Sequence, residues 1–196
     1  RPYKILTICN TGKLACGTIG TALGVISKLA ENNQVEHVYV CETRPFLQGS
    51  RLTAFELKKE KISHEVIVEG ALSYILSNKK VDAIFVGADR IVKNGDTANK
   101  IGTATISVLA SYYNIPFYVV APTSSFDLTL ESGREINIEV REPSEILEVN
   151  GIKITGPGVN ALNPSFDITE GKNITGIICE KGLIKPVNRK NIIEVM

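Results

Sequence analysis

The sequence is poor in the side chains on which most metal and redox sites depend. It contains two histidines and four cysteines, and the cysteines show neither the C-x-x-C spacing nor the Cys/His spacing of a zinc site. We therefore expect no metal, and we expect a reducing, cytoplasmic location in which the thiols stay free. The cysteines are Cys9, Cys16, Cys41 and Cys179.

Long apolar runs and basic clusters are also missing. No stretch reaches the roughly 18–20 apolar residues of a membrane span, and no signal-peptide pattern is present. The 22 lysines and arginines are scattered and nearly balanced by 21 acidic residues. The sequence therefore indicates neither membrane insertion nor a nucleic-acid partner.

What the sequence does contain is an alternation of short apolar runs, rich in β-branched residues, with longer segments of helical period. This alternation is typical of βαβ units, and 196 residues suit one domain. It predicts an α/β fold, a doubly wound, mostly parallel Rossmann-like sheet with helices on both faces. The predicted strands are Lys4–Cys9, Glu36–Cys41, His64–Val68, Asp82–Val86, Pro116–Ala121 and Ile174–Cys179. The predicted helices are Ile19–Glu31, Ser50–Lys59, Ala71–Ser77 and Asn99–Tyr112.

The region from Thr123 to Pro164 does not follow this alternation. It is rich in glycine, proline and acidic residues. We expect a long excursion there, with a hairpin around Ile136–Val149, before the chain returns for its last strand.

The predicted topology brings two reactive side chains together. Doubly wound sheets commonly have strand order 3-2-1-4-5-6 and bind ligands beyond the carboxyl ends of strands 1 and 4. Cys9 ends the first predicted strand, and Asp89 lies just past the fourth. We therefore expect Cys9 and Asp89 to face one another across the ligand-binding crevice.

Each of these two residues has a structural alternative. Cys9 could be a buried small hydrophobic residue rather than a functional thiol. Asp89 could act as a general acid or base, or could belong to a surface turn with Arg90 or cap a helix. The residues alone leave both alternatives open.

The loop that follows Cys9 is rich in glycine and leads into a predicted helix, so its backbone N–H groups could hold an anion. It lacks the spacing of a dinucleotide fingerprint and the Lys-Ser/Thr of a P-loop. Glu42 stands where a ribose-binding acid would stand in a nicotinamide-binding domain, but without the fingerprint we do not favour that function. The glycines could equally serve a tight turn and close packing.

Further polar residues lie near the predicted crevice. Asp96 is expected to cap the following helix, which would place Asn99 and Lys100 in its first turns. An amide and an ammonium there could bind hydroxyls and phosphate, and Gln48 could bind a sugar hydroxyl. Taken singly, each could be an ordinary solvated residue. The two histidines, His37 and His64, fall at strand starts on the opposite side and are not expected to be catalytic.

Taken together, the motifs form an ordered set that resembles the methylthioribose-1-phosphate isomerase family. This family is related to ribose-1,5-bisphosphate isomerases and to regulatory subunits of a translation-initiation guanine-nucleotide exchange factor. The resemblance runs from Ile5 to Pro186. The motifs are CNTG at 9–12, GTALG at 20–24, ETRP at 42–45, QG at 48–49, GADR at 87–90, NGDTANKIGT at 94–103 and NPSFD at 163–167.

The resemblance implies an aldose–ketose isomerase of methionine salvage that uses no cofactor. The positions matching Cys9 and Asp89 are the catalytic pair of the family, and those matching Gln48, Asn99 and Lys100 bind substrate. Because both members of the pair are retained, the resemblance favours the enzymes over the non-catalytic regulatory subunits. The intact GADR and NGDTANKIGT motifs favour the methylthioribose branch over the bisphosphate isomerases.

The resemblance also implies partners. Family members carry an N-terminal domain with an Arg-Gly-Ala-Pro-Ala segment that helps to bind the substrate phosphate, and that segment does not occur in these residues. We therefore expect residues 1–196 to form the C-terminal catalytic domain of a longer protein, with an incomplete site by itself. The expected partners are a small sugar phosphate, the protein's own N-terminal domain and a second copy in a homodimer.

Overall fold

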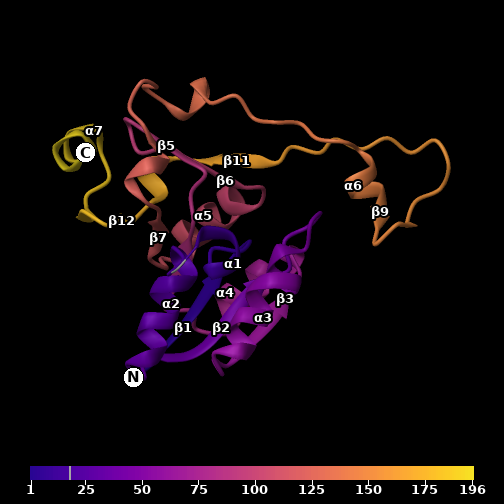
Figure 1. The fold of residues 1–196 in the computed structure, drawn as a ribbon, viewed down its shortest axis with the longest axis horizontal. Coiled ribbons are helices and arrows are strands. Elements are labelled where there is room, and N and C mark those ends of the chain that lie inside the picture. The colour runs from indigo at the N-terminus through magenta and orange to yellow at the C-terminus, as the bar shows by residue number, and fades with distance from the viewer. Residues whose placement is uncertain (18) are drawn as a thin grey trace.

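The computed structural model describes residues 1–17 and 19–196 (Figure 1), and its main feature is a seven-stranded sheet. The spatial order is β13-β12-β7-β4-β1-β2-β3. The strands are β1 (Tyr3–Thr7), β2 (Val35–Cys41), β3 (His64–Ile67), β4 (Ala83–Val86), β7 (Phe117–Val120), β12 (Gly176–Cys179) and β13 (Gly182–Ile184).

The order confirms the prediction made from the sequence. All six predicted strands form, and their order is 3-2-1-4-5-6 with parallel pairing throughout. The short strand β13, which pairs antiparallel with β12, was not predicted. β1 ends at Thr7, so Cys9 lies beyond the strand and not at its last position.

Helices cover both faces of this sheet, as expected for a doubly wound fold. The helices α2 (Ala22–Glu31) and α3 (Ala54–Lys59) bury Leu23, Ile26 and Leu57 in one apolar core. A second core contains buried residues of α4 (Leu72–Asn78), α5 (Thr103–Tyr112) and α7 (Arg189–Val195). The two cores make the central strands inaccessible to water, which leaves the strand ends for function.

The prediction of a helix over Asn99–Tyr112 is wrong at its start. Residues Thr97–Lys100 form strand β6, and helix α5 begins only at Thr103. Gly102 adopts a positive φ of 101°, which ends the strand and turns the chain into the helix. The helix start is capped by Asp167, whose carboxylate accepts hydrogen bonds from the N–H groups of Gly102 and Ala104.

β6 belongs to a second sheet that the sequence analysis missed. Its spatial order is β11-β6-β5-β8, with mostly antiparallel pairing. The remaining strands are β5 (Arg90–Val92), β8 (Phe126–Asp127) and β11 (Phe166–Thr169). This sheet begins directly after Asp89 and therefore stands at the carboxyl end of β4.

The excursion between β8 and β11 forms an arm that projects away from the main sheet (Figure 1). It carries the short helix α6 (Ser144–Leu147) and a hairpin of β9 (Glu148–Val149) and β10 (Ile152–Lys153). The hairpin predicted around Ile136–Val149 is therefore misplaced. Glycine at 151 and Asn150, both at positive φ, make the tight turn between β9 and β10.

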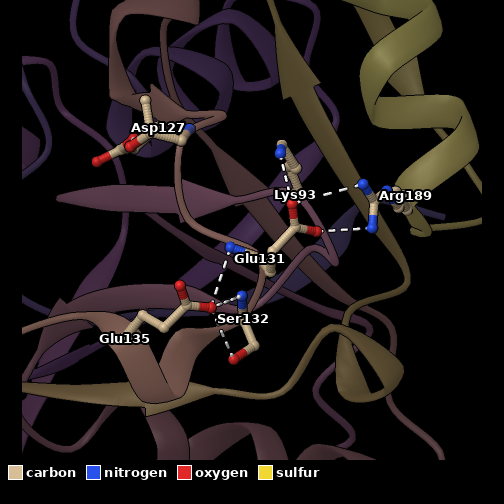
Figure 2. Close-up of polar contacts among 7 residues, drawn as sticks. Lys93, Asp127, Glu131, Ser132, Glu135 and Arg189 are labelled. Atoms are coloured by element: carbon tan, nitrogen blue, oxygen red, sulfur yellow. Dashed lines mark hydrogen bonds and ion pairs between the residues drawn. The ribbon is translucent and has the colours of Figure 1, made fainter.

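The C-terminal helix α7 is tied to the second sheet by charged side chains. The carboxylate of Glu131 accepts from Lys93 Nζ at 2.6 Å and pairs with Arg189 Nη1 at 2.6 Å (Figure 2). Its neighbour Ser132 begins a short turn closed by Glu135, which accepts from the Ser132 N–H at 2.9 Å. These contacts hold α7 against the second sheet, and none of their residues lines the crevice at the ends of β1 and β4.

Asp96 does not cap α5, the helix that follows it, contrary to the sequence expectation, and instead joins three loops. Its carboxylate accepts hydrogen bonds from the N–H of Gly133 at 3.0 Å, the N–H of Gly171 at 2.9 Å and the side chain of Asn94 at 2.9 Å. The segments before β6, after β8 and after β11 are thereby held around one negative charge.

We expect Asp96→Ala to destabilise the fold by about 2–3 kcal/mol, because hydrogen bonds to a charged acceptor are lost and two backbone donors are left without partners. Urea unfolding followed by circular dichroism measures this change. The control is Glu31→Ala, which removes only an exposed contact to Lys28. An Asp96→Ala midpoint equal to that of the control would contradict the role assigned to Asp96.

Candidate active site

A pocket of about 500 Å³ lies beyond the carboxyl ends of β1 and β4. This is the switch point at which the topology predicts ligand binding. Cys9, Asp89, Asn99 and Lys100 all contribute to the lining, as expected from the sequence. The other lining residues are Asn10, Thr11, Cys16, Ile19, Gly20, Thr21, Gly87, Ala88, Pro122, Ser125 and Phe166.

Cys9 is held in an unusual backbone conformation. Its φ is 65°, in the left-handed region that residues with a side chain seldom adopt. Thr43 accepts a hydrogen bond from the Cys9 N–H at 2.9 Å, and the Thr53 hydroxyl donates to the Cys9 carbonyl at 2.5 Å. Both peptide groups that flank the thiol are therefore fixed by threonine hydroxyls.

The thiol of Cys9 is kept in its neutral form by its surroundings. Burial raises the pKa of Cys9 above its ordinary value, and this effect exceeds the opposing effects of the Asn10 backbone N–H and the Lys100 charge. The neutral thiol therefore predominates near neutral pH. In this respect Cys9 differs from a cysteine that is activated as a thiolate.

The backbone N–H groups of the glycine-rich loop after Cys9 bind an anion, as its composition suggested, but this anion is the side-chain carboxylate of Glu56. The buried Glu56 carboxylate accepts from the Lys13 N–H at 2.8 Å and from the Leu14 N–H at 3.4 Å. It also accepts from the Asn10 amide at 2.9 Å. A Cβ at Gly12 would lie 2.5 Å from the Glu56 oxygens, so glycine is needed for this approach. These donors of the loop are not free for an external phosphate.

Asp89 lines the pocket and lies immediately before β5. Its backbone N–H donates to the Ala98 carbonyl at 2.9 Å, which fixes the residue beside β6. Its side chain is exposed, and the neighbouring Arg90 pairs with Asp127 and not with Asp89. The surface pair of Asp89 with Arg90 is therefore not formed, and the Asp89 carboxylate is open to a ligand in the pocket.

Asn99 and Lys100 reach the pocket from strand β6, whereas the sequence analysis placed them on a helix. The Asn99 amide donates to Thr103 at 3.0 Å, which leaves its carbonyl oxygen as an acceptor. Lys100 is buried, with 9% of the residue exposed, and its Nζ lies 5.0 Å from the ring centre of Phe166 and 5.6 Å from that of Phe46.

Within the described residues, Lys100 has no carboxylate within 4.0 Å. A buried ammonium ion is costly unless an opposite charge balances it. The aromatic faces of Phe46 and Phe166 supply part of that balance. The arrangement therefore favours an anionic ligand next to Lys100.

Gln48 is the one predicted substrate-binding residue that does not line the pocket among the described residues. It lies just before η1 (Gly49–Thr53), a π-helical turn that leads into α3. Its side-chain oxygen is buried and has no hydrogen-bond partner among the described residues. An acceptor is thus available, and the predicted contact of Gln48 with substrate stays a prediction.

Sequence reasoning missed the residues that hold the site together. Thr43, Thr53 and Glu56 lie far from Cys9 in sequence, and their role depends on contacts that no local spacing reveals. Two features of the sequence could have indicated these residues. Thr43 lies within the ETRP motif, and Glu56 is an acidic residue on a face of α3 that packs inward.

No group of three or more His, Cys, Asp or Glu side chains within residues 1–17 and 19–196 is arranged to hold a metal ion. In the same part of the chain, no helix combines the length and the apolar character that crossing a bilayer requires.

The sheet order and the pocket at its switch point define an α/β domain of the doubly wound class, with a thiol, a carboxylate and an ammonium at one ligand site. The model of the initiation factor 2 subunit family matches residues 2–186. The chain belongs to this family, which confirms the resemblance inferred from the motifs.

Among curated relatives, methylthioribose-1-phosphate isomerase from Thermoanaerobacter sp. (strain X514) is 53% identical over 191 residues, which cover 97% of this chain and 55% of the relative. Among solved structures, the 5-methylthioribose 1-phosphate isomerase from Pyrococcus horikoshii OT3 has a TM-score of 0.96 at 43% identity, covering 99% of this chain and 55% of that one. The translation initiation factor eIF-2B, subunit delta, from A. fulgidus has a TM-score of 0.94 at 40% identity, covering 98% of this chain and 56% of that one. The chain therefore spans about half the length of the proteins that it matches.

Proposed function

We propose that the natural protein is an aldose–ketose isomerase that converts 5-methylthioribose 1-phosphate to 5-methylthioribulose 1-phosphate. The observation that carries the proposal is the convergence of Cys9, Asp89 and the unpaired Lys100 on one pocket. The similarity to enzymes named for this substrate supports it.

The chemistry begins with ring opening, because the phosphate on C1 prevents the spontaneous opening of a free aldose. Asp89 donates a proton to the ring oxygen as the bond between that oxygen and C1 breaks. A hydrogen then moves from C2 to C1, which reduces C1 and oxidises C2 to the ketone. No electrons enter or leave the substrate, so the reaction needs no external oxidant or reductant.

Two routes are available for the hydrogen. In one, the Cys9 thiolate takes the C2 proton and an enol phosphate forms; the proton is then returned to C1 while the 2-hydroxyl loses its proton, which leaves the ketone at C2. In the other, the hydrogen moves as hydride from C2 to C1 while the 2-hydroxyl loses its proton, and the neutral Cys9 thiol stabilises the transition state. The raised pKa of Cys9 favours the second route.

Lys100 is assigned to the substrate phosphate, since it is the buried cation of the pocket and none of the ion pairs among the described residues includes it. The Lys100 charge contributes to the lowered pKa of Glu145, after the larger effect of the Arg141 hydrogen bond, but Glu145 is itself paired with Arg141. Lys100→Met should raise KM by about 10- to 100-fold, the equivalent of about 1.5–3 kcal/mol for a hydrogen bond to a charged group. Steady-state kinetics measure this effect, with Lys28→Met, which removes an exposed lysine, as the control. An unchanged KM would contradict the assignment.

The direct test is an isomerase assay of the complete natural protein with two substrates. Turnover of 5-methylthioribose 1-phosphate well above that of ribose 1,5-bisphosphate is the expected result, and the reverse preference would make the protein a bisphosphate isomerase. Absence of turnover with both, together with binding to a guanine-nucleotide exchange factor, would favour the regulatory function. That alternative is considered because of the similarity to the A. fulgidus structure.

We further propose that residues 1–196 act as the C-terminal catalytic domain of the natural protein, with phosphate binding completed by a segment outside them. Lys100 is the only lysine or arginine among the described lining residues, and nearly half of each relative's length lies outside the matched region. We also infer a homodimer in a reducing, cytoplasmic setting. The arm exposes apolar side chains such as Ile152 and Leu162 that a second copy could cover. Light scattering of the natural protein tests the assembly.

A further inference from the structure

The backbone of the pocket residue Cys9 adopts a left-handed conformation that cysteine does not favour by itself. Cys9 has no glycine-like freedom, and a positive φ costs free energy that the surroundings must offset. The residues that offset it come from two other parts of the chain, namely the loop after β2 and the end of η1.

Thr43 provides the first contact. Its hydroxyl donates to the Cys41 carbonyl at 3.0 Å and, with its oxygen so oriented, accepts from the Cys9 N–H at 2.9 Å. Thr43 is itself fixed, because its backbone N–H donates to the carboxylate of Glu69 at 2.7 Å. Thr43 is buried, with 1% of the residue exposed. Water therefore cannot take the place of its hydroxyl as a hydrogen-bond partner without a change in packing.

Thr53 provides the second contact and is the end of a polar chain. Its hydroxyl donates to the Cys9 carbonyl, and it accepts from the Asn10 amide at 3.2 Å. The same Asn10 amide donates to Glu56 at 2.9 Å. Since the Glu56 carboxylate can only accept, the direction of every hydrogen bond in this chain is set.

We propose that Thr43 and Thr53 are positioning residues for Cys9, whose hydroxyls hold the Cys9 peptide in its left-handed conformation and so aim the thiol into the pocket. Neither threonine lines the pocket, so both act through Cys9 and not on the substrate. The effect on turnover rests on the proposed isomerase function, whereas the effect on the thiol does not.

The test compares the reactivity of the Cys9 thiol in Thr43→Val, Thr53→Val and the unaltered natural protein. The probe is iodoacetamide, and the rate of modification of the Cys9 peptide is followed by mass spectrometry from neutral to alkaline pH. Without its clamp the thiol becomes more accessible to water. We expect alkylation to be about five- to tenfold faster, since each lost hydrogen bond contributes about 1 kcal/mol. The pH midpoint of the alkylation rate should fall towards that of an ordinary thiol.

Thr97→Val is the matched control, because Thr97 is fully buried and its hydroxyl also donates to a carbonyl two residues earlier, that of Gly95. Thr43→Ser and Thr53→Ser keep the hydroxyl and should restore the alkylation rate. Should a valine variant fail to fold, the alanine and serine variants at the same position give the same comparison. Alkylation of Cys9 that is unchanged or slower in the valine variants, or equal in the valine and serine variants, would overturn the proposal.

Turnover separates this proposal from the proposed function. If the natural protein isomerises the sugar phosphate, the valine variants should lose about tenfold or more in kcat with little change in KM, as expected for a misplaced reacting group. If it has no isomerase activity but Cys9 alkylation responds as described, the positioning role stands and the function assigned to the pocket fails. If it is active and alkylation does not respond, the positioning role fails alone.

Discussion

Asp89→Asn is expected to lower kcat by about 10²–10⁴-fold, the typical contribution of a positioned acid or base. By rate arithmetic this corresponds to about 3–5 kcal/mol at the barrier. Asparagine preserves the shape of the side chain but cannot deliver a proton to the ring oxygen. The Asp89 backbone contact to Ala98 is unaffected, so the fold should be retained.

Stopped-time assays of the natural protein measure this loss, and Asp127→Asn is a suitable control. Asp127 is a nearby carboxylate that lies outside the pocket and bonds to the hydroxyl and N–H of Thr129. The control should keep its activity. Near-normal kcat in Asp89→Asn would show that another group protonates the ring oxygen.

Cys9→Ala should cause a loss of similar size, about 10²–10⁴-fold in kcat, if the thiol contributes to the transition state as a positioned acid or base does. Cys179→Ala, which removes a free thiol outside the pocket, should leave activity unchanged. Equal activity of the two alanine variants would contradict the assignment of Cys9.

The form in which Cys9 acts can be read from the pH dependence. Burial raises the pKa of Cys9, so deprotonation is delayed to a higher pH than for an ordinary thiol. If the neutral thiol is the active form, kcat should stay level through the ordinary thiol range and fall at more alkaline pH. A kcat that rises with pH across that range, and loses the rise in Cys9→Ala, would instead assign Cys9 as a base. Little solvent deuterium at C1 of the product is expected for the neutral form, because a hydride that moves within the substrate does not exchange.

The sheet could be predicted from the sequence because its strands are nearly continuous in apolar residues and its helices have a clear period. The crevice followed from strand order, and both Cys9 and Asp89 line the pocket at that place. What failed was the region from Asp89 to Lys100. No proline separates Asn99 and Lys100 from the residues of helix α5, so the sequence pattern reads as one helix. It does not reveal that residues Thr97–Lys100 form a strand and that Gly102 turns the chain into the helix.

The second sheet could not be predicted because its strands are short and two of its three pairings, β6 with β11 and β5 with β8, join distant parts of the chain. β6 pairs with β11, and the two strands are joined only through α5, β7 and the whole arm. The support of Cys9 by Thr43 and Thr53 was hidden for a related reason. A threonine hydroxyl can bond to its own backbone, to a neighbour or to water, and sequence does not distinguish these partners.

Glu56 has a consequence for ligand choice. In many doubly wound proteins the loop after the first strand is the place where a nucleotide deposits its phosphates. Here the Glu56 carboxylate accepts hydrogen bonds from the backbone N–H groups of Lys13 and Leu14 in that loop. Its negative charge also disfavours the binding of a phosphate there. On the function proposed above, we expect the phosphate of the sugar to bind towards Lys100 on the second sheet, with the sugar carbons nearer to Cys9. The Glu56 carboxylate therefore excludes one possible phosphate position, and Lys100 offers the other.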